Sequence, residues 1–224
     1  MTTLRWTGSV APRFGRRVLV AAPHPDDEIL GCAGIMTWLD GAGVAVEVLA
    51  VTDGDASHAL STRITPATLV TRRAKERKRA LATLDLGHVP VHRLHFADGA
   101  VAARHPQLLA AIRSHLDAES TLIVPWRSDG HPDHEAVARA GLAAAVAAGA
   151  ACFEVPIWAR VRGHRCVPTH VLELGSLRDR KRAAVAEFES QLAPLGPEAV
   201  DGPVVHPDEL QQLTSDTELI MAGS

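Results

Sequence analysis

A histidine and three carboxylates stand together in the segment Pro23-His24-Pro25-Asp26-Asp27-Glu28. Adjacent acids repel one another and resist burial unless a positive group compensates them. A divalent metal ion beside the histidine would supply that charge. A second segment, His131-Pro132-Asp133-His134-Glu135, places two histidines three residues apart, on one side of a helical turn. These two segments are the part of the chain best suited to metal chemistry.

A catalytic zinc ion usually has three protein ligands and an open position for water. His24 and Asp27 with His134 would give two nitrogens and one carboxylate, a set that suits Zn²⁺ and would also accept Fe²⁺ or Co²⁺. The metal lowers the pKa of its bound water to about 7, and Asp26 could accept that proton as general base. His131, as an imidazolium, could stabilise an oxyanion and protonate a leaving amine. This inventory suits hydrolysis of an amide or an ester.

Simpler structural roles are open for several of these side chains. His24 could be a buried histidine that bonds only to the backbone, and Asp26 could be only the N-cap of the following helix. Glu28 could support a ligand histidine or serve as a charge at the helix N-terminus. Asp133 and Glu135 are expected to be helix-start acids and not ligands. We favour the metal and base roles for His24 and Asp26 because both occur beside further potential ligands.

Apolar runs that predict strands alternate with helical patterns along the chain. The predicted strands span 17–22, 44–51, 91–96, 121–125, 151–157 and 170–174. The predicted helices span 29–39, 67–84, 107–116, 136–147 and 177–192. This order predicts βαβ units, and therefore an α/β fold with a mainly parallel sheet and helices on both faces. Both histidine segments then follow strand ends, at the edge of the sheet where ligands bind.

The length of 224 residues fits one domain, 1–224, with a core at about 17–192. The Pro- and Gly-containing tail, 193–224, is expected to wrap the surface. A net charge of −3 provides no global basic field, so we expect no nucleic-acid partner. The basic stretch at 72–79 is expected to be a solvated helix face.

Three cysteines without a CxxC spacing indicate neither a disulfide framework nor a four-cysteine zinc site. The N-terminal segment lacks the pattern of a secretory signal, and no apolar run is long enough to cross a bilayer. We therefore expect a cytoplasmic protein without a membrane span.

The alternative function is a nucleotide- or S-adenosylmethionine-binding module without hydrolase activity. Such a domain would place G-x-G-x-x-G at the first βα turn, where its amides would hold phosphate. Here Asp26, Asp27 and Glu28 occupy that turn and would repel phosphate. Gly31 and Gly34 come later, where we expect them to let the helix approach the sheet.

The segment Pro-His-Pro-Asp-Asp-Glu after the first predicted strand, with His-Pro-Asp-His opening a later helix, resembles the PIG-L/LmbE family. The resemblance covers roughly residues 17 to 192 and includes further segments. These are Val51-Thr52-Asp53-Gly54-Asp55-Ala56-Ser57, Arg73-Ala74-Lys75-Glu76, Pro125-Trp126 and Pro156-Ile157-Trp158. It implies a Rossmann-like fold and a metal-dependent N-deacetylase that acts on N-acetylglucosamine-type substrates.

Carried over by position, the resemblance implies His24, Asp27 and His134 as metal ligands, Asp26 as base and His131 on the side of the oxyanion. A small-molecule amino sugar or glycoconjugate would be the partner, and a homo-oligomer remains open.

The resemblance also implies that an arginine, Arg73 or Arg72, and Asp98 contact sugar hydroxyls. Trp126 lies close in sequence to the second motif and is expected to line the sugar site. Some members of the family use a tyrosine near the metal, whereas this chain contains no tyrosine.

Overall fold

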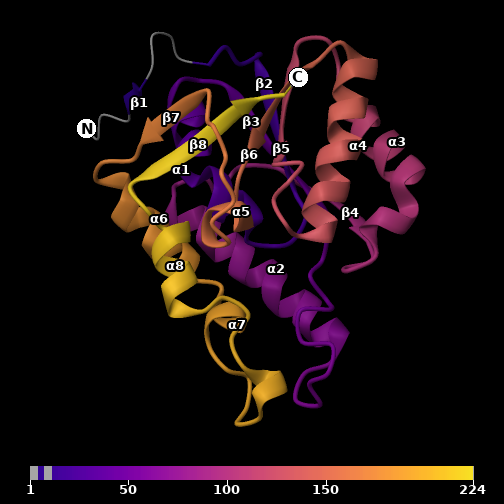
Figure 1. The fold of residues 1–224 in the computed structure, drawn as a ribbon, viewed down its shortest axis with the longest axis vertical. Coiled ribbons are helices and arrows are strands. Elements are labelled where there is room, and N and C mark those ends of the chain that lie inside the picture. Colours follow the sequence, from indigo (N-terminus) through magenta and orange to yellow (C-terminus); the bar gives the residue numbers. More distant parts are fainter. Residues whose placement is uncertain (1–4, 8–11, 224) are drawn as a thin grey trace.

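The computed structural model describes residues 5–7 and 12–223. Its centre is a sheet with the strand order β1-β7-β8-β6-β5-β2-β3-β4 (Figure 1). The strands are β1 (Arg5–Thr7), β2 (Arg17–Ala22), β3 (Ala45–Thr52), β4 (Val91–Phe96), β5 (Ser120–Pro125), β6 (Ala151–Val155), β7 (His170–Glu173) and β8 (Thr217–Ala222). The α-helices are α1 (Asp27–Gly41), α2 (Pro66–Thr83), α3 (His105–Ser114), α4 (Pro132–Ala148), α5 (Trp158–Val161), α6 (Leu177–Ala186), α7 (Glu189–Leu192) and α8 (Pro207–Leu213). Short 3-10 turns occupy Val101–Arg104 and Ala199–Asp201.

Five neighbouring strands pair in parallel, as the alternation of strands and helices predicts. They lie in the order β6, β5, β2, β3 and β4. Strand β2 is buried along nearly its whole length because helices cover both faces of the sheet. Residues of α1, α2 and α6 contribute to the apolar core on one face, and residues of α3 and α4 to the core on the other. The predicted α/β class is therefore confirmed.

The two histidine segments meet because their strands are neighbours. Strand β2 pairs directly with β5, with Val20 opposite Ile123. The chain leaves both strands at the same edge and enters α1 and α4 respectively. Parallel pairing thus brings together two segments that lie about a hundred residues apart in sequence.

The prediction that the tail wraps the surface is wrong for its last segment. Strand β8 lies inside the sheet, between β6 and β7, and pairs antiparallel with both. Its alternating side chains put Glu218 and Ile220 into the interior. An antiparallel strand needs no helical crossover, so a short segment after α8 suffices to extend the core beyond residue 192. The unpredicted strand β1 pairs with β7.

A buried ion pair joins α6 to β8, and both of its residues bind the backbone of α1. Lys181 Nζ lies 2.8 Å from Glu218 Oε1, and both side chains are fully buried. Lys181 also donates to the Leu30 carbonyl, while Glu218 accepts from the N–H groups of Gly34 and Ile35. A Cβ at Gly34 would lie 2.2 Å from Leu174 Cδ2, so glycine allows the close approach predicted for this helix.

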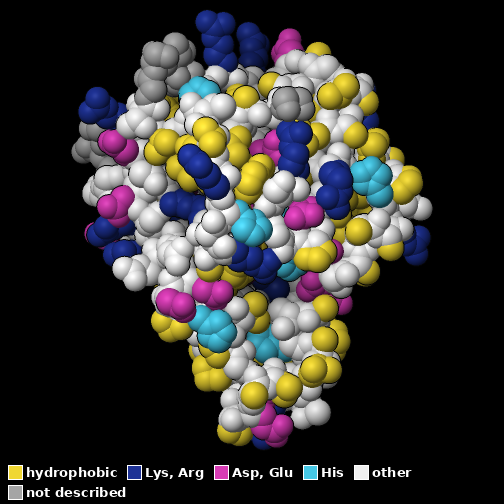
Figure 2. All heavy atoms as spheres, viewed as in Figure 1, with side chains coloured by type: hydrophobic (Ala, Val, Ile, Leu, Met, Phe, Trp, Pro, Cys, Tyr) yellow, Lys and Arg dark blue, Asp and Glu magenta, His cyan; other side chains and the backbone are white. Residues whose placement is uncertain are grey.

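Two segments distant in sequence form a projecting part of the molecule, at the bottom of Figure 1. They are the loop 53–65 before α2 and the stretch 193–206 after α7. Ser61 donates to Asp201 at 2.5 Å, and His58 Nε2 lies 3.2 Å from the Gly202 carbonyl. On the face shown in Figure 2, acidic and basic side chains are interspersed. Among the described residues, no helix combines the length and apolar character needed to cross a membrane.

Candidate metal centre and active site

The three predicted metal ligands lie together. One donor atom from each of His24, Asp27 and His134 falls within 4.8 Å of the others. Asp27 Oδ2 lies 3.1 Å from His24 Nδ1 and 3.2 Å from His134 Nε2, and it accepts the His24 backbone N–H at 2.8 Å. Although burial opposes ionisation, His134 and His24 hold the pKa of Asp27 well below its usual range. The cluster therefore presents an ionised carboxylate between two imidazoles.

His134 supplies the observation that tests whether a metal fits. Its Nε2 is buried and has no hydrogen-bond partner within the described part of the chain. Its other ring nitrogen, Nδ1, lies 2.8 Å from Asp129 Oδ2. A metal-binding histidine commonly donates its second N–H to a carboxylate, which fixes the ring and leaves the other nitrogen free for the ion. The cluster of His24, Asp27 and His134 thus fits a divalent cation.

Asp129 supports the His134 ring, a role that was not assigned to it from the sequence. Besides His134, its carboxylate accepts backbone N–H groups from Ile157, Trp158 and Ala159, at the start of α5. The side chain is fully buried. Asp129 therefore ties the histidine of α4 to the loop that follows β6. The signal in the sequence was only its place two residues before His131.

A second group of potential ligands shares His24. Its Nε2 lies 3.2 Å from Asp98 Oδ1 and 3.4 Å from Asp133 Oδ2. These two carboxylates already accept backbone N–H groups, from Ala56 to Asp98 and from Gly99 and Val101 to Asp133. The first group, with its free His134 nitrogen, is therefore the better metal site. The predicted sugar-binding residue Asp98 contacts His24 in this structure.

Asp26 occupies the N-cap position of α1, yet its side chain makes no capping hydrogen bond. Its carboxylate lines the cavity beside the metal cluster, and its Oδ2 lies 3.0 Å from Arg73 Nη2. Burial raises the pKa of Asp26 to about 7, Arg73 opposes that rise, and Asp27 adds to it. Asp26 also has a positive φ of 151°, an uncommon conformation for a residue other than glycine. The capping role considered from sequence is therefore not what this side chain does.

Arg73, which was expected to contact a sugar hydroxyl, instead forms hydrogen bonds within the protein. The guanidinium donates to Asp26, to the Pro25 carbonyl and to the Gly54 carbonyl. Gly54 has φ +69°, and a Cβ there would lie 2.2 Å from Arg73 Nη1. Arg73 is only 2% exposed, although it lines the cavity. Arg72 instead pairs with Glu76.

Arg77 and Glu28 form a second buried pair from the same two elements. Arg77 Nε and Nη2 donate to the two oxygens of Glu28, at 2.8 and 3.2 Å, and Nη2 also donates to the His24 carbonyl. Glu28 therefore supports, through Arg77, the backbone of the loop that contains His24. The prediction of a solvated basic face on α2 is wrong for Arg73 and Arg77, because these residues project inward and neutralise two of the three adjacent acids.

His131 is the N-cap of α4, and Pro132 is at the first helical position, where its missing N–H costs no hydrogen bond. The ring Nδ1 accepts the Asp133 N–H at 3.3 Å, which leaves the proton on Nε2. Burial, together with His134 and His24, lowers the pKa of His131 to about 4. This shift and the accepted N–H both favour a neutral ring that donates through Nε2–H, in place of the imidazolium expected from the sequence, and the ring centroid lies 4.8 Å from that of His134.

These side chains open into a cavity of about 310 Å³. His24, Asp26, Asp27, Arg73, Asp98 and His131 line one side of it. The remaining lining residues come from the projecting part, from the loop after β4 and from segments late in the chain: Ala56, Ser57, Gly99, Trp158, Gln191 and Val204. The predicted tryptophan, Trp126, is not in this lining, and Trp158 is the tryptophan that is. Trp158 belongs to a segment of the family resemblance but was not assigned to the sugar site, and Gln191 on α7 carried no sequence signal that linked it to the motifs.

Comparison with known proteins gives matches over the part of the chain that contains both histidine segments. A family model described as PIG-L, GlcNAc-PI de-N-acetylase, matches residues 19–145, more than half of the chain. The diacetylchitobiose deacetylase of Thermococcus kodakarensis is 30% identical over 138 residues, which are 60% of this chain and 51% of that protein. The chain therefore spans about half the length of this curated relative.

Solved structures share the fold. The conserved protein TT1542 from Thermus thermophilus has a TM-score of 0.68 at 23% identity, and the match covers 92% of this chain and 94% of that protein. The N,N'-diacetylchitobiose deacetylase from Pyrococcus horikoshii has a TM-score of 0.63 at 18% identity, with 83% and 73% covered. At these identities the likeness establishes the fold alone. The family match spans both histidine segments up to residue 145, and with them the whole cluster of His24, Asp27 and His134, so the chain belongs to the PIG-L family.

Proposed function

We propose that this chain is a metal-dependent hydrolase that removes the acetyl group, or another acyl group, from the nitrogen of an amino sugar or its conjugate. The observation that carries the proposal is the buried His134 Nε2, which lacks a hydrogen-bond partner among the described residues and faces Asp27. His24, Asp27 and His134 would hold the ion, with Zn²⁺ as the first candidate and Fe²⁺ or Co²⁺ as alternatives.

When bound there, the ion would polarise the acyl carbonyl and lower the pKa of a water molecule. Asp26 lines the cavity beside the cluster and is free of any capping role, so it would accept the proton of the attacking water. Arg73 orients the Asp26 carboxylate. The proton that Asp26 accepts can then pass to the leaving nitrogen. His131 would donate its Nε2–H to the oxyanion that forms on the acyl group.

The cavity suits a polar ring. Ser57 and Gln191 offer hydrogen-bonding groups, and Trp158 offers an aromatic surface on which the apolar face of a sugar could pack. The named deacetylase relatives act on diacetylchitobiose, as their names state. A small N-acetylated amino sugar, alone or in a conjugate, is therefore the substrate class we assign to this chain.

The nucleotide- or S-adenosylmethionine-binding alternative has less support. Asp26, Asp27 and Glu28 are buried at the turn where such a module would bind phosphate. The family match also covers this turn. Both observations favour the hydrolase.

The test is an acetate-release assay over a panel of N-acetylated amino sugars and their conjugates, with Zn²⁺, Fe²⁺ or Co²⁺ supplied. We expect release from at least one member of the panel and its loss after chelation. A parallel thermal-shift measurement with ATP and S-adenosylmethionine should show no stabilisation. The binding module would be favoured if ATP or S-adenosylmethionine stabilised the protein, chelator left its thermal stability unchanged and no acetate were released.

A further inference from the structure

A second cavity, of about 310 Å³, lies between α2 and β4. It shares no lining residue with the catalytic cavity. Pro25 lines it, whereas the residues on either side of Pro25, His24 and Asp26, line the catalytic cavity. The two cavities therefore lie on opposite sides of one loop. A volume of this size is at the lower end of small-molecule sites.

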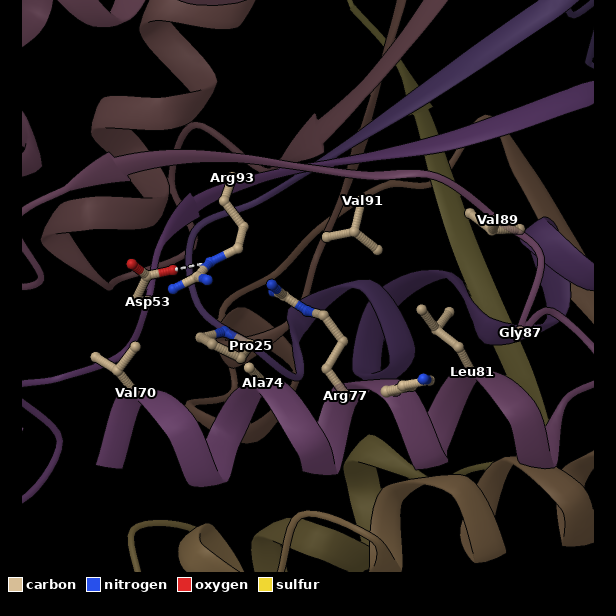
Figure 3. A pocket seen from close by; sticks show the side chains of 11 residues that line it. Pro25, Asp53, Val70, Ala74, Arg77, Leu81, Gly87, Val89, Val91 and Arg93 are labelled. Carbon is tan, nitrogen blue, oxygen red and sulfur yellow. Dashed lines mark hydrogen bonds and ion pairs between the residues drawn. The ribbon is translucent and has the colours of Figure 1, made fainter. Parts of the chain in front are cut away.

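One end of this α2–β4 cavity is apolar. Leu81 from α2, Val89 from the loop before β4 and Val91 from β4 form its wall there (Figure 3). Val70 and Ala74 extend the apolar lining along α2. Strand β4 is the last strand of the sheet, so no further strand covers this side.

The other end is basic. Figure 3 shows the guanidinium groups of Arg77 and Arg93 turned toward the same space, next to Pro25. Arg77 is 5% exposed, and its Nε and Nη2 are bonded to Glu28 and His24. Its Nη1 has no recorded partner among the residues described. Arg93 uses Nε to bind Asp53 at 2.7 Å, and its terminal nitrogens likewise have no recorded partner there.

The carboxylate in this lining, that of Asp53, is already hydrogen-bonded to two basic side chains. Asp53 accepts from Arg93 and lies 2.8 Å from His95 Nδ1. Although burial opposes it, this hydrogen bonding to Arg93 and His95 holds the pKa of Asp53 below its usual value. Lys78 adds a further positive charge to the lining. The cavity therefore pairs unused cationic N–H groups at one end with a hydrocarbon wall at the other.

We propose that the α2–β4 cavity binds a small amphipathic monoanion, a carboxylate that carries a medium-length alkyl or aryl body. The carboxylate would accept hydrogen bonds from the free nitrogens of Arg77 and Arg93. The apolar body would lie along Leu81, Val89 and Val91. This assignment does not depend on the proposed hydrolase activity, because the two cavities share no lining residue.

The test is isothermal titration calorimetry of the metal-loaded protein with sodium octanoate. Ala74 is exposed on α2 and lines the cavity, so Ala74→Trp fills the space without removing a packed side chain. Arg93→Gln removes one cationic donor. We expect saturable binding to wild type and an affinity about tenfold or more lower in each variant, the scale for losing a charge-assisted hydrogen bond. Octan-1-ol should bind at least about tenfold more weakly than octanoate, for the same reason.

Two matched variants serve as controls. Ala67→Trp makes the same substitution on α2 outside the cavity, and Lys75→Gln removes a charge from the same helix outside the lining. Both should keep the wild-type affinity. Absence of saturable binding would overturn the proposal, and so would octanoate binding that Ala74→Trp and Arg93→Gln leave unchanged, since that places the ligand elsewhere. Equal affinity for octan-1-ol would overturn the assignment of an anion.

Discussion

Arg73 Nη2 lies 3.0 Å from Asp26 Oδ2, and both residues are almost fully buried. This contact fixes a carboxylate whose backbone has a φ of 151°. Uncommon backbone conformations persist where the surroundings over-determine them, and they concentrate at functional sites. The guanidinium is in turn held by the carbonyls of Pro25 and Gly54. The proposed base is thus positioned by its neighbours and not by its own conformational preference.

The base assignment predicts a loss of activity without a loss of metal in Asp26→Asn. The amide keeps the size of the side chain but cannot accept the proton, so turnover should fall about 10²–10⁴-fold. Acetate release and metal content measured on the same preparation check this expectation. Asp55→Asn, in the neighbouring loop and outside the cavity lining, is the control and should retain activity. Turnover of Asp26→Asn close to that of wild type would show that another group accepts the proton.

Gly54→Ala should impair the site through Arg73. The new Cβ would lie 2.2 Å from Arg73 Nη1, so the guanidinium must move away from Asp26. Gly43→Ala is a matched control, because Gly43 also has a positive φ (+76°) but nothing within 4 Å of the new Cβ. Both substitutions should cost about 1–2 kcal/mol of stability for the left-handed conformation, and Gly54→Ala should cost more because it also displaces the buried Arg73 guanidinium. Only Gly54→Ala should also lower kcat, and equal kcat values in the two variants would contradict the positioning role of Arg73.

Asp129→Asn should weaken metal binding. The asparagine can still accept backbone N–H groups at the start of α5, but it loses the charge that orients His134. Substitution of such a supporting carboxylate typically lowers metal affinity about 10–100-fold. Competition with a chromophoric chelator measures this change, with the exposed Asp117→Asn as control. An unchanged affinity would mean that Asp129 serves only to cap α5.

Under the proposed function, metal removal should destabilise the protein, because an ion held by His24, Asp27 and His134 would bind the folded state. Free metal at about 100 times its Kd adds about 2.7 kcal/mol, or roughly 5–10 °C in Tm for a chain of this size. His134→Ala should abolish the metal-dependent shift. His131→Ala, which removes a neighbouring imidazole outside the proposed ligand set, should preserve it. A metal-dependent shift that survives in His134→Ala would move the site to His24, Asp98 and Asp133.

The buried pair of Lys181 and Glu218 predicts a non-additive double mutant. Lys181→Met leaves an unpaired carboxylate in the interior and should cost about 3–5 kcal/mol. Adding Glu218→Gln removes that charge while its carbonyl oxygen can still accept from Gly34 or Ile35. The double variant should therefore be more stable than Lys181→Met alone, as measured by urea unfolding. A double variant that loses the sum of both single changes would show that the two residues act independently.

The fold and the metal cluster could be predicted from sequence because they follow from local patterns. Strands that alternate with helices force parallel pairing, and parallel pairing places strand ends at one edge. His24, Asp27 and His134 follow two such ends and meet as expected. The positions of Pro132 and Gly34 also follow from local rules, since one opens a helix and the other permits close packing.

The remaining features depend on partners far away in the chain. Arg73 and Arg77 looked like a solvated charge run, but they are buried against acids 47 and 49 residues earlier. Strand β8 contains a buried glutamate that is compensated by Lys181 and by two backbone N–H groups of α1. The lowered pKa of His131 arises from its burial and from the neighbouring His134 and His24, which composition and spacing cannot reveal.

The order of synthesis gives the pair of Lys181 and Glu218 a further meaning. Helix α1, which begins with Asp27, is made early, yet the carboxylate that binds its Gly34 and Ile35 amides belongs to β8. Strand β8 must also insert between β6 and β7, which are both complete before it. During translation, the helix that carries Asp27, a proposed metal ligand, therefore obtains its final anchor only after residue 218 has left the ribosome. A nascent chain that stops short of that residue can contain every proposed metal ligand and still lack the anchored helix that positions one of them.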